Sequence, residues 1–439
     1  MGQEKSISGF SKLSPEQKIS WLKKTFHVPE EHLDQLVSHL HADPKLQDIY
    51  NEFSENTVSN FFIPYGLAPN FLINNHWYVV PMAIEESSVV AAASHAAKFW
   101  SAKGGFRAKV INMRKVGQVH FHWSGDTDFI TGTFQQSRED LITALDPVTA
   151  SMRKRGGGIS KIELINKTGD LENYYQLHVE FLTADAMGAN FINTVLETLA
   201  KKWKEKVEQQ AAIHKKSGDI EINMAILSNY TPESLVRIWV ETHVDQLGAF
   251  DPRLSGKEFA GKFIRAVDIA REDTYRAVTH NKGIFNGMDG VVIATGNDFR
   301  AVEACGHAYA AKDGVYRSLS RAELSGDTFR FTLEIPMSVG TVGGLTSGHP
   351  LARISLKILR DPSAEELMMI IAAAGLANNF SAVRSLITSG IQKGHMKMHL
   401  TNILRQLDAD EKQKAAAIAY FSDRTVSFTE VKQFLGNKK

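Results

Sequence analysis

The feature that most constrains the fold of this chain is a change of hydrophobic pattern between Phe106 and about Ile220. In this stretch, short runs with strand periodicity alternate with helical segments, whereas helical patterns dominate on both sides of it. We expect strands at Gln118–Trp123 and Lys161–Ile165, and helices at Ser137–Arg153 and Ala186–Gln210. The alternation predicts an α+β protein in which a mixed module is inserted into a larger, mostly helical domain.

The inserted module divides the chain into three parts. With 439 residues and 43% hydrophobic content, the chain is long enough to bury more than one core. We expect residues 1–107 and 223–388 to form the large domain, residues 108–222 the small domain, and residues 389–439 a C-terminal helical flap. The large domain starts with short helices, because Ser14-Pro15-Glu16-Gln17 is a capping box with proline at the first helical position.

Charge and cysteine content argue against several classes of function. The 50 basic and 49 acidic side chains nearly cancel, so no nucleic-acid partner is expected. A single cysteine, Cys305, excludes an intrachain disulfide and a cysteine-rich zinc site, and it fits the cytoplasm. The longest apolar run, around Leu367–Ala374, is shorter than the roughly 18 residues that span a bilayer, so no membrane anchor is expected. His395 and His399 lack further ligands, so no metal site is expected.

The segment Asp185-Ala186-Met187-Gly188-Ala189-Asn190 stands at the start of a predicted helix. Asp185 can cap that helix, and Gly188 leaves room for a phosphate to approach the exposed amides at the helix N-terminus. A capped helix with a packing glycine explains the same six residues equally simply. No G-x-G-x-x-G motif follows a predicted strand, so a Rossmann dinucleotide fold is not supported.

Four ionisable residues in separate segments could carry chemistry. Lys282 lies among turn-forming residues, where a lysine is usually solvated, although in a dry site it would stabilise negative charge on a carbonyl oxygen. Asp298 is expected to cap a helix and Glu86 to precede one, which are ordinary structural roles for carboxylates. His395 could protonate a leaving group near neutral pH, although a lone surface histidine is ordinarily inert.

Several segments, taken together and in this order, resemble the soluble (class II) form of 3-hydroxy-3-methylglutaryl-CoA reductase. They are Ile84–Ala93, Asp185–Asn190, Thr279–Ile284, Thr295–Ala304 and Gly394–Met396. The resemblance extends over nearly the whole chain beyond about Ser54. It implies an enzyme of the mevalonate pathway that converts 3-hydroxy-3-methylglutaryl-CoA to mevalonate and CoA by two hydride transfers.

The resemblance also implies a role for each catalytic residue. Lys282 would hold the oxyanion that develops on the substrate carbonyl, and Glu86 would supply a proton to the oxygen at the aldehyde level. Asp298 would bond to the lysine and tune the acid. His395, on a closing flap, would protonate the CoA thiolate.

Ligand-binding residues are implied in both domains. The guanidinium of Arg276 would hold the free carboxylate of the substrate in a bidentate fork, and Ser88 and Asn286 would make further substrate contacts. The residues implied for the nicotinamide nucleotide are Asp185, Met187, Gly188, Asn190, Gly343 and Gly344. The nucleotide-binding domain of this family is ferredoxin-like and not a Rossmann fold.

The choice between NADPH and NADH stays open at the level of the sequence. NADH-using relatives carry an acidic residue before a Gly-Gly-Gly turn, and in this chain Thr149 stands at that position. Arg153 follows, at the start of a basic run that precedes the glycines. A missing acid and added basic groups favour the 2′-phosphate of NADPH by analogy with other folds, whereas a solvated basic turn is an equally simple interpretation.

The implied ligands are 3-hydroxy-3-methylglutaryl-CoA, CoA and NADPH or NADH, and the implied assembly is at least a homodimer. Two alternatives remain. The same site could oxidise mevalonate with NAD, or the chain could be a catalytically silent protein that binds acyl-CoA or a nucleotide. The silent protein should have lost the acid, the lysine or the histidine, and this chain keeps all of them.

Overall fold

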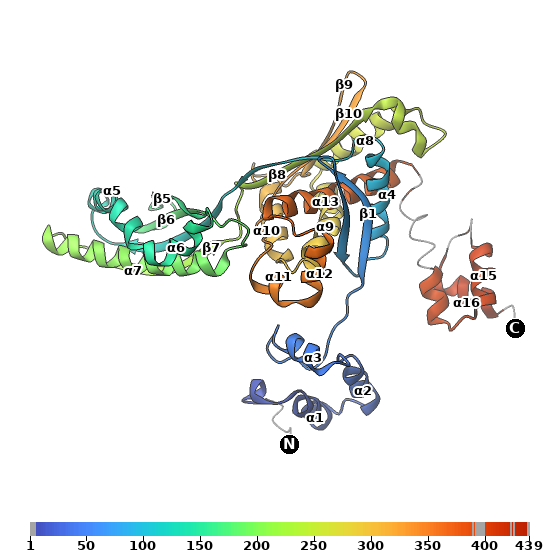
Figure 1. The fold of residues 1–439 in the computed structure, drawn as a ribbon, viewed down its shortest axis with the longest axis horizontal. Coiled ribbons are helices and arrows are strands. Elements are labelled where there is room, and N and C mark those ends of the chain that lie inside the picture. The colour runs from blue at the N-terminus through green and yellow to red at the C-terminus, as the bar shows by residue number, and fades with distance from the viewer. Residues whose placement is uncertain (1–5, 389, 391–399, 422–423, 425, 437–439) are drawn as a thin grey trace.

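The computed structural model describes residues 6–388, 390, 400–421, 424 and 426–436. Three separate clusters of buried hydrophobic side chains organise these residues. The first cluster combines residues 68–108 with 236–383, the second uses residues 119–220, and the third uses residues 400–431. Figure 1 shows the second cluster's body projecting to the left of the first, which makes the small domain an arm of the molecule.

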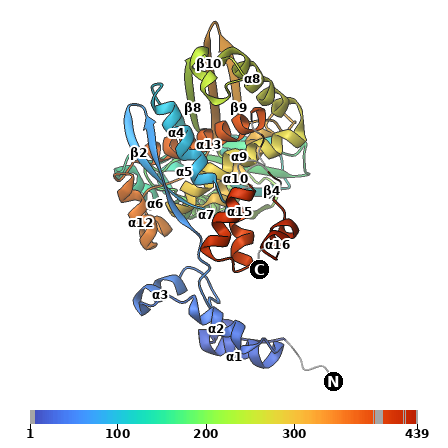
Figure 2. The ribbon, with the colours of Figure 1, turned by 90° about the vertical axis from the view of Figure 1, so that its right-hand side faces the viewer.

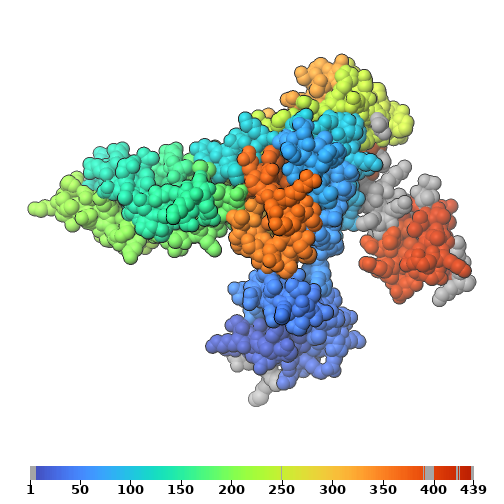
Figure 3. Space-filling view, in the orientation of Figure 1, coloured from blue at the N-terminus to red at the C-terminus, as the bar shows by residue number. Residues whose placement is uncertain are grey.

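Three short helices precede the first core. They are α1 (Pro15–Phe26), α2 (Glu30–Ser38) and α3 (Pro44–Asn51). The predicted capping box is confirmed, because the Ser14 side chain accepts from the Gln17 amide and the Gln17 side chain accepts from the Ser14 amide. The three helices project from the main body and are joined to it by an extended segment (Figures 1 and 2). They also touch the large domain (Figure 3), because the rings of Tyr50 and Phe53 contact the His349 ring.

The large domain contains more sheet than the sequence pattern predicted. An antiparallel pair, β1 (Tyr65–Ile73) and β2 (His76–Ala83), is followed by a four-stranded antiparallel sheet of order β3-β8-β10-β9. Its strands are β3 (Arg107–Met113), β8 (Ser234–His243), β9 (Ser320–Ser325) and β10 (Thr328–Pro336). The expectation that helical patterns dominate after the inserted stretch is therefore wrong for β8, where alternate residues face the core.

Helices pack on the inner side of this sheet around one central helix. They are α4 (Val89–Ser101), α8 (Gly256–Glu272), α9 (Thr274–Ala294), α10 (Phe299–Ala310), α11 (Gly344–Gly348), α12 (Pro350–Ile358) and α13 (Ala364–Ile387). Among the helices of the described residues, α13 alone is long and apolar enough to cross a membrane. Its most apolar stretch is 83% buried inside the protein, so α13 is the core helix of the large domain.

The small domain has the element order β-α-β-β-α-β, with a second helix in the first crossover. Its elements are β4 (Lys115–Trp123), α5 (Thr127–Ala144), α6 (Asp146–Lys154), β5 (Gly158–Asn166), β6 (Tyr174–Leu182), α7 (Ala189–Ile213) and β7 (Ile220–Ser228). The strands pair antiparallel in the order β5-β6-β4-β7, which is the strand order of ferredoxin-like domains. The single helix expected at Ser137–Arg153 is two helices, because α5 ends at Ala144 and proline occupies the first turn of α6.

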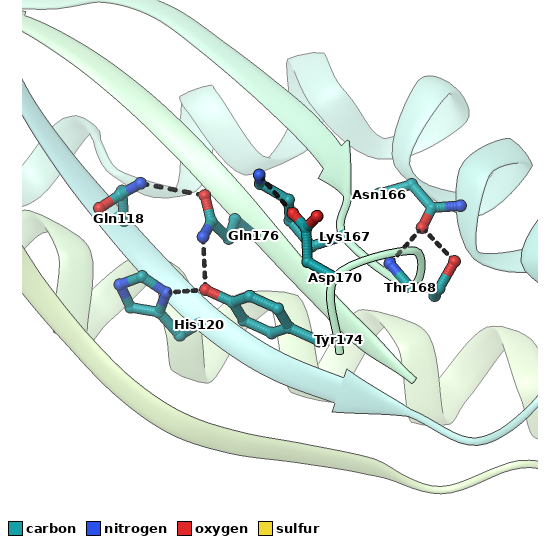
Figure 4. A network of polar contacts seen from close by, with 8 residues as sticks. All are labelled: Gln118, His120, Asn166, Lys167, Thr168, Asp170, Tyr174 and Gln176. Carbon is teal, nitrogen blue, oxygen red and sulfur yellow. Dashed lines mark hydrogen bonds and ion pairs between the residues drawn. The ribbon is translucent and has the colours of Figure 1, made fainter. Parts of the chain in front are cut away.

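The sheet of the small domain has one apolar face and one polar face. Alternate residues of β4 are buried beneath the helices, and the intervening residues point the other way. On the polar face Gln118 donates to the Gln176 side chain at 3.0 Å, and the His120 ring nitrogen Nδ1 lies 2.6 Å from the Tyr174 hydroxyl (Figure 4). Gln176 also donates to Tyr174, so the network ties β4 to β6 across the face without helices.

The domain boundaries differ slightly from those expected. Strand β3, which starts at Arg107, pairs with β8 and belongs to the large sheet, whereas β7 continues to Ser228 in the small sheet. The connections between the two bodies therefore fall near residues 114 and 229, rather than at 107 and 222. In the C-terminal part, α15 (Glu411–Tyr420) and α16 (Phe428–Gly436) contribute to the third core.

Candidate functional site

A pocket of about 540 Å³ opens where the loop after β2, one face of α9 and the N-terminus of α10 meet. Its polar lining includes Glu86, Lys282, Asn286, Asp289, Asp298 and Glu303. The structure therefore brings together three of the four predicted catalytic residues, which are widely separated in the sequence. The fourth, His395, lies outside the described residues.

Lys282 and Glu86 form an ion pair at this pocket. The expectation that Lys282 lies in a loop is wrong, because Asp273 caps α9 and the helix continues through Lys282 to Ala294. A position within a helix fixes the lysine backbone more firmly than a turn would. The Lys282 side chain is 59% exposed and the Glu86 side chain 36% exposed, so a ligand in the pocket can reach both.

Asp298 caps α10, as the sequence predicted. Its carboxylate accepts from the amides of Arg300 and Ala301, and it also pairs with the Arg300 guanidinium at 3.2 Å. The Lys282 amine makes its ion pair with Glu86 and not with Asp298. The contact between lysine and aspartate that the resemblance implied is therefore absent from this arrangement, although both groups line one pocket.

Two carboxyl groups in the pocket were missed at the level of the sequence. Asp289 lies on α9 seven residues after Lys282, which is two helical turns, and Glu303 lies on α10. Burial, and next the neighbouring Glu303 carboxyl, raise the pKa of Asp289 well above its usual range. One buried Asp289 oxygen has no hydrogen-bond partner among the described residues. The spacing of seven from Lys282 was the only signal that could have indicated Asp289.

The three predicted substrate residues are placed differently from one another. Asn286 lines the pocket one turn after Lys282. Ser88 precedes α4 in the left-handed conformation, with φ of 74°, which is strained for a serine and is typical of functional sites. Arg276 lies outside the pocket lining, on a different side of α9 from Lys282. Burial lowers the pKa of Arg276, and no carboxylate within the described residues pairs with it.

The predicted cofactor segment differs from expectation at its first residue. The helix begins at Ala189, and its N-cap is Gly188, not Asp185. Asp185 instead accepts at 2.8 Å from the amide of Ala364, which is the first residue of α13 in the large domain. Gly188 has φ of +91°, and a Cβ atom there would lie 2.5 Å from the Thr183 side chain. Asn190 is exposed in the first turn of α7.

The glycine-rich segment before α11 connects the cofactor segment to the pocket. The Thr341 amide donates to the Asp185 carbonyl and the Gly340 amide to the Asn297 side chain, both at 2.8 Å. A Cβ atom at Gly340 would lie 2.3 Å from the Met187 nitrogen, so the two backbones are in close contact. Gly343 and Gly344 both have positive φ, and the space beside them is open. This open backbone next to exposed helix amides fits an anionic nucleotide.

Of the two residues predicted to select the cofactor, Thr149 is buried and Arg153 is engaged by a neighbouring carboxylate. Thr149 is buried on α6, and its hydroxyl donates to the Leu145 carbonyl at 3.0 Å. Arg153 forms an ion pair at 2.7 Å with Asp146, which lies two turns earlier on the same helix. Asp146 is thus an acidic group beside the basic turn, and the sequence argument from Thr149 overlooked it.

Comparison with known proteins identifies close relatives over most of the chain. Residues 14–400 match the family described as hydroxymethylglutaryl-coenzyme A reductase. A 3-hydroxy-3-methylglutaryl-coenzyme A reductase of Archaeoglobus fulgidus is 36% identical over 398 residues, which cover 90% of this chain and 86% of the relative. A probable reductase of Borreliella burgdorferi is 32% identical, covering 82% of this chain and 79% of the relative.

Solved structures from Streptococcus pneumoniae agree with this relationship. A 3-hydroxy-3-methylglutaryl-coenzyme A reductase has a TM-score of 0.73 and 34% identity, covering 99% of this chain and all of the other. A class II reductase bound to NADPH in open conformations has a TM-score of 0.71 and 35% identity, covering 87% of this chain and all of the other. Sequence and fold therefore point to the same group of proteins.

Proposed function

The chain belongs to the hydroxymethylglutaryl-coenzyme A reductase family, and from this premise we propose how its residues divide the work of the reaction. It is a reductase of the mevalonate pathway that uses NADPH or NADH to convert 3-hydroxy-3-methylglutaryl-CoA to mevalonate and CoA. The observation that carries our assignment of residues is the ion pair between Lys282 and Glu86 at the pocket.

Lys282 acts on the oxygen of the substrate carbonyl. The bound nicotinamide nucleotide supplies hydride to the carbonyl carbon, and negative charge then develops on the oxygen. A positive group held in place before the reaction stabilises that charge without reorganisation of solvent. Glu86, in contact with Lys282, supplies the proton to the oxygen when the aldehyde is reduced. Asp298 and the Asp289–Glu303 carboxyls set the electrostatic environment of this pair.

Three other residues act at the two ends of the substrate. A bare CoA thiolate is a poor leaving group near neutral pH, so we assign its protonation to His395. We assign the free carboxylate of the substrate to Arg276 together with Ser88. Arg276 lies outside the pocket formed by one copy, which supports a site that a second copy of the chain completes.

The small domain binds the nucleotide through the segment containing Asp185, Met187, Gly188 and Asn190. Its contact with the backbone of Gly340 and Thr341 supports this assignment, because Gly340 donates to Asn297, which lines the pocket. Gly343 and Gly344 follow in the same segment and remain candidates for nucleotide binding. We retain Thr149 and Arg153 as candidates for the choice of nucleotide, with Asp146 as a competing partner for Arg153. We also propose that the small domain is an insertion in the large domain and that the C-terminal residues form a flap. We further propose that the protein is a homodimer located in the cytoplasm.

The first experiment mixes the purified protein with 3-hydroxy-3-methylglutaryl-CoA and either NADPH or NADH. We expect oxidation of the nucleotide with release of CoA and formation of mevalonate, followed by absorbance and by mass spectrometry. Faster turnover of mevalonate with NAD and CoA than of the forward reaction would favour the oxidative direction. No turnover in either direction, by a protein that remains folded, would contradict the proposal and leave a silent binding protein.

Complementation tests the assignment of Arg276. We expect Arg276→Ala and Lys282→Ala to be inactive as separate proteins and to recover part of the activity when they are co-expressed. Activity can recover only if one copy of the chain contributes Arg276 and the other contributes Lys282 to the same site. Co-expressed variants that stay inactive, although they form mixed dimers, would place both residues in the same copy or remove Arg276 from the site.

A further inference from the structure

A buried lysine that the reaction does not use lies directly beneath the cofactor segment. Lys115, the first residue of β4, is only 3% exposed. Its amine donates to the Thr183 hydroxyl at 2.7 Å, to the Ala186 carbonyl at 2.8 Å and to the Met187 carbonyl at 2.9 Å. All three partners are neutral oxygens that lie about 70 residues further along the chain.

The three contacts require the charged form of the amine. Thr183 uses its own proton on the Ala186 carbonyl at 2.6 Å, so its oxygen must accept from Lys115. The two carbonyls can only accept. An ammonium group has three protons for these three oxygens, whereas a neutral amine would point a lone pair at one of them. Burial takes the amine out of water and lowers the pKa of Lys115 to about 7. The three hydrogen bonds act in the opposite direction, because they favour the charged form.

Among the residues that the structure describes, no nearby carboxylate pairs with the Lys115 amine. Glu180, on the neighbouring strand β6, pairs with Arg114 at 3.2 Å. Asp185, in the loop above, accepts from the amide of Ala364. Burial is the single cause of the lowered pKa of Lys115, which agrees with the absence of a charged partner among the described residues. The positive charge is therefore available to act on an anion beyond the loop.

The contacts also set the direction of the loop amides. In a trans peptide the N–H group points opposite to the C=O group. The carbonyls of Ala186 and Met187 point at Lys115, so the amides that follow them, on Met187 and Gly188, point away from it. The Met187 nitrogen lies against the backbone of Gly340, whereas the Gly188 amide donates to no partner in the described part of the chain. Together with the amides of the first turn of α7, the Gly188 amide forms a group of free donors.

We propose that Lys115 is a positioning residue of the nucleotide site, which turns the amide of Gly188 toward an anionic group of the cofactor. This inference rests on the proposed function, because it takes the Asp185–Asn190 segment as the nucleotide site. A pyrophosphate is present in both NADPH and NADH. Loss of Lys115 therefore weakens both nucleotides equally, whereas a residue that contacts the 2′-phosphate would affect NADPH alone.

The test compares Lys115→Met with the unaltered protein by calorimetric titration of NADPH and of NADH, without substrate. We expect the Kd for each nucleotide to rise about tenfold, with the ratio of the two unchanged. At saturating NADPH, kcat should change little, and so should the KM for 3-hydroxy-3-methylglutaryl-CoA. Lys204→Met is the matched control, since Lys204 is an exposed residue of α7, four turns beyond its start.

A measurement on the unaltered protein covers the case in which Lys115→Met does not fold. The Kd for NADH, which has no 2′-phosphate to titrate, should rise as the pH passes upward through about 7, because Lys115 loses its proton there. A folded Lys115→Met should show a weaker Kd with no such rise. A Kd that is unchanged by the substitution, or a flat Kd in the unaltered protein, would overturn the role of Lys115. Failure of the unaltered protein to bind either nucleotide would overturn the proposed function itself.

Discussion

Two lysines in the two domains illustrate opposite uses of one side chain. Lys282, in the pocket of the large domain, is 59% exposed and contacts a carboxylate. Lys115, beneath the cofactor loop of the small domain, is 3% exposed and contacts only neutral oxygens. A lysine that acts on a substrate must be reachable and must exchange its partner, whereas a lysine that shapes backbone must be enclosed. The contrast matches the two roles that we propose, catalysis for Lys282 and positioning for Lys115.

The largest effect should come from Lys282→Ala. Removing a preorganised charge that faces a developing oxyanion costs about 10²- to 10³-fold in rate. We expect kcat to fall by this amount while the Kd for NADPH stays unchanged, as measured by steady-state kinetics and calorimetry. Lys204→Ala provides the control. If Lys282→Ala keeps more than a tenth of the rate, the oxyanion is held by another group and the contrast between the lysines fails.

Gly340→Ala tests the contact between the two regions. The added Cβ would lie 2.3 Å from the Met187 nitrogen, so one backbone must move. Overpacking of this kind costs about 1 to 3 kcal/mol, and we expect it to appear as a Kd for both nucleotides raised by about tenfold. Gly132→Ala is a suitable comparison, since nothing lies within 4 Å of that position. Unchanged affinity in a folded Gly340→Ala would separate the glycine segment from nucleotide binding.

Arg153→Ala tests the predicted preference for NADPH. If Arg153 contacts the 2′-phosphate, its loss should raise the Kd for NADPH about threefold to tenfold and leave NADH unchanged. The effect should be smaller than that of Lys115→Met on NADH, because Asp146 already engages Arg153 at 2.7 Å. Asp146→Ala should act in the opposite direction and tighten NADPH. Equal changes for both nucleotides would remove Arg153 from the choice of cofactor.

The smallest effect concerns the stability of the pocket. In the unfolded chain an aspartate loses its proton near pH 4, whereas burial and Glu303 make folded Asp289 keep it to higher pH. The folded state then binds more protons than the unfolded state above pH 4, so stability falls as the pH rises. We expect Asp289→Asn to raise Tm by roughly 2 °C at pH 8 and by less at pH 5. An increase in Tm that is no larger at pH 8 than at pH 5 would contradict the raised pKa of Asp289.

The agreement between sequence and structure depends on the range of the interactions. The capping box at Ser14 and the cap at Asp298 were predicted correctly, because each joins atoms at most three residues apart. Lys282 was predicted incorrectly as a loop residue. Its neighbours have turn-forming character, but packing of α9 against α13 buries much of the helix and overrides that local preference.

Local motifs and caps in the sequence were enough to indicate the family, the inserted mixed domain and Glu86, Lys282 and Asp298 as candidate residues. What those residues touch became visible only in the folded chain. Glu86 and Lys282 are 196 residues apart, Asp185 accepts from an amide 179 residues away, and Lys115 donates to oxygens 68 to 72 residues away. Contacts between residues so far apart in the chain, and the burial of these residues, depend on how whole helices and strands pack together. A local sequence pattern covers only one member of each pair and cannot predict the contact.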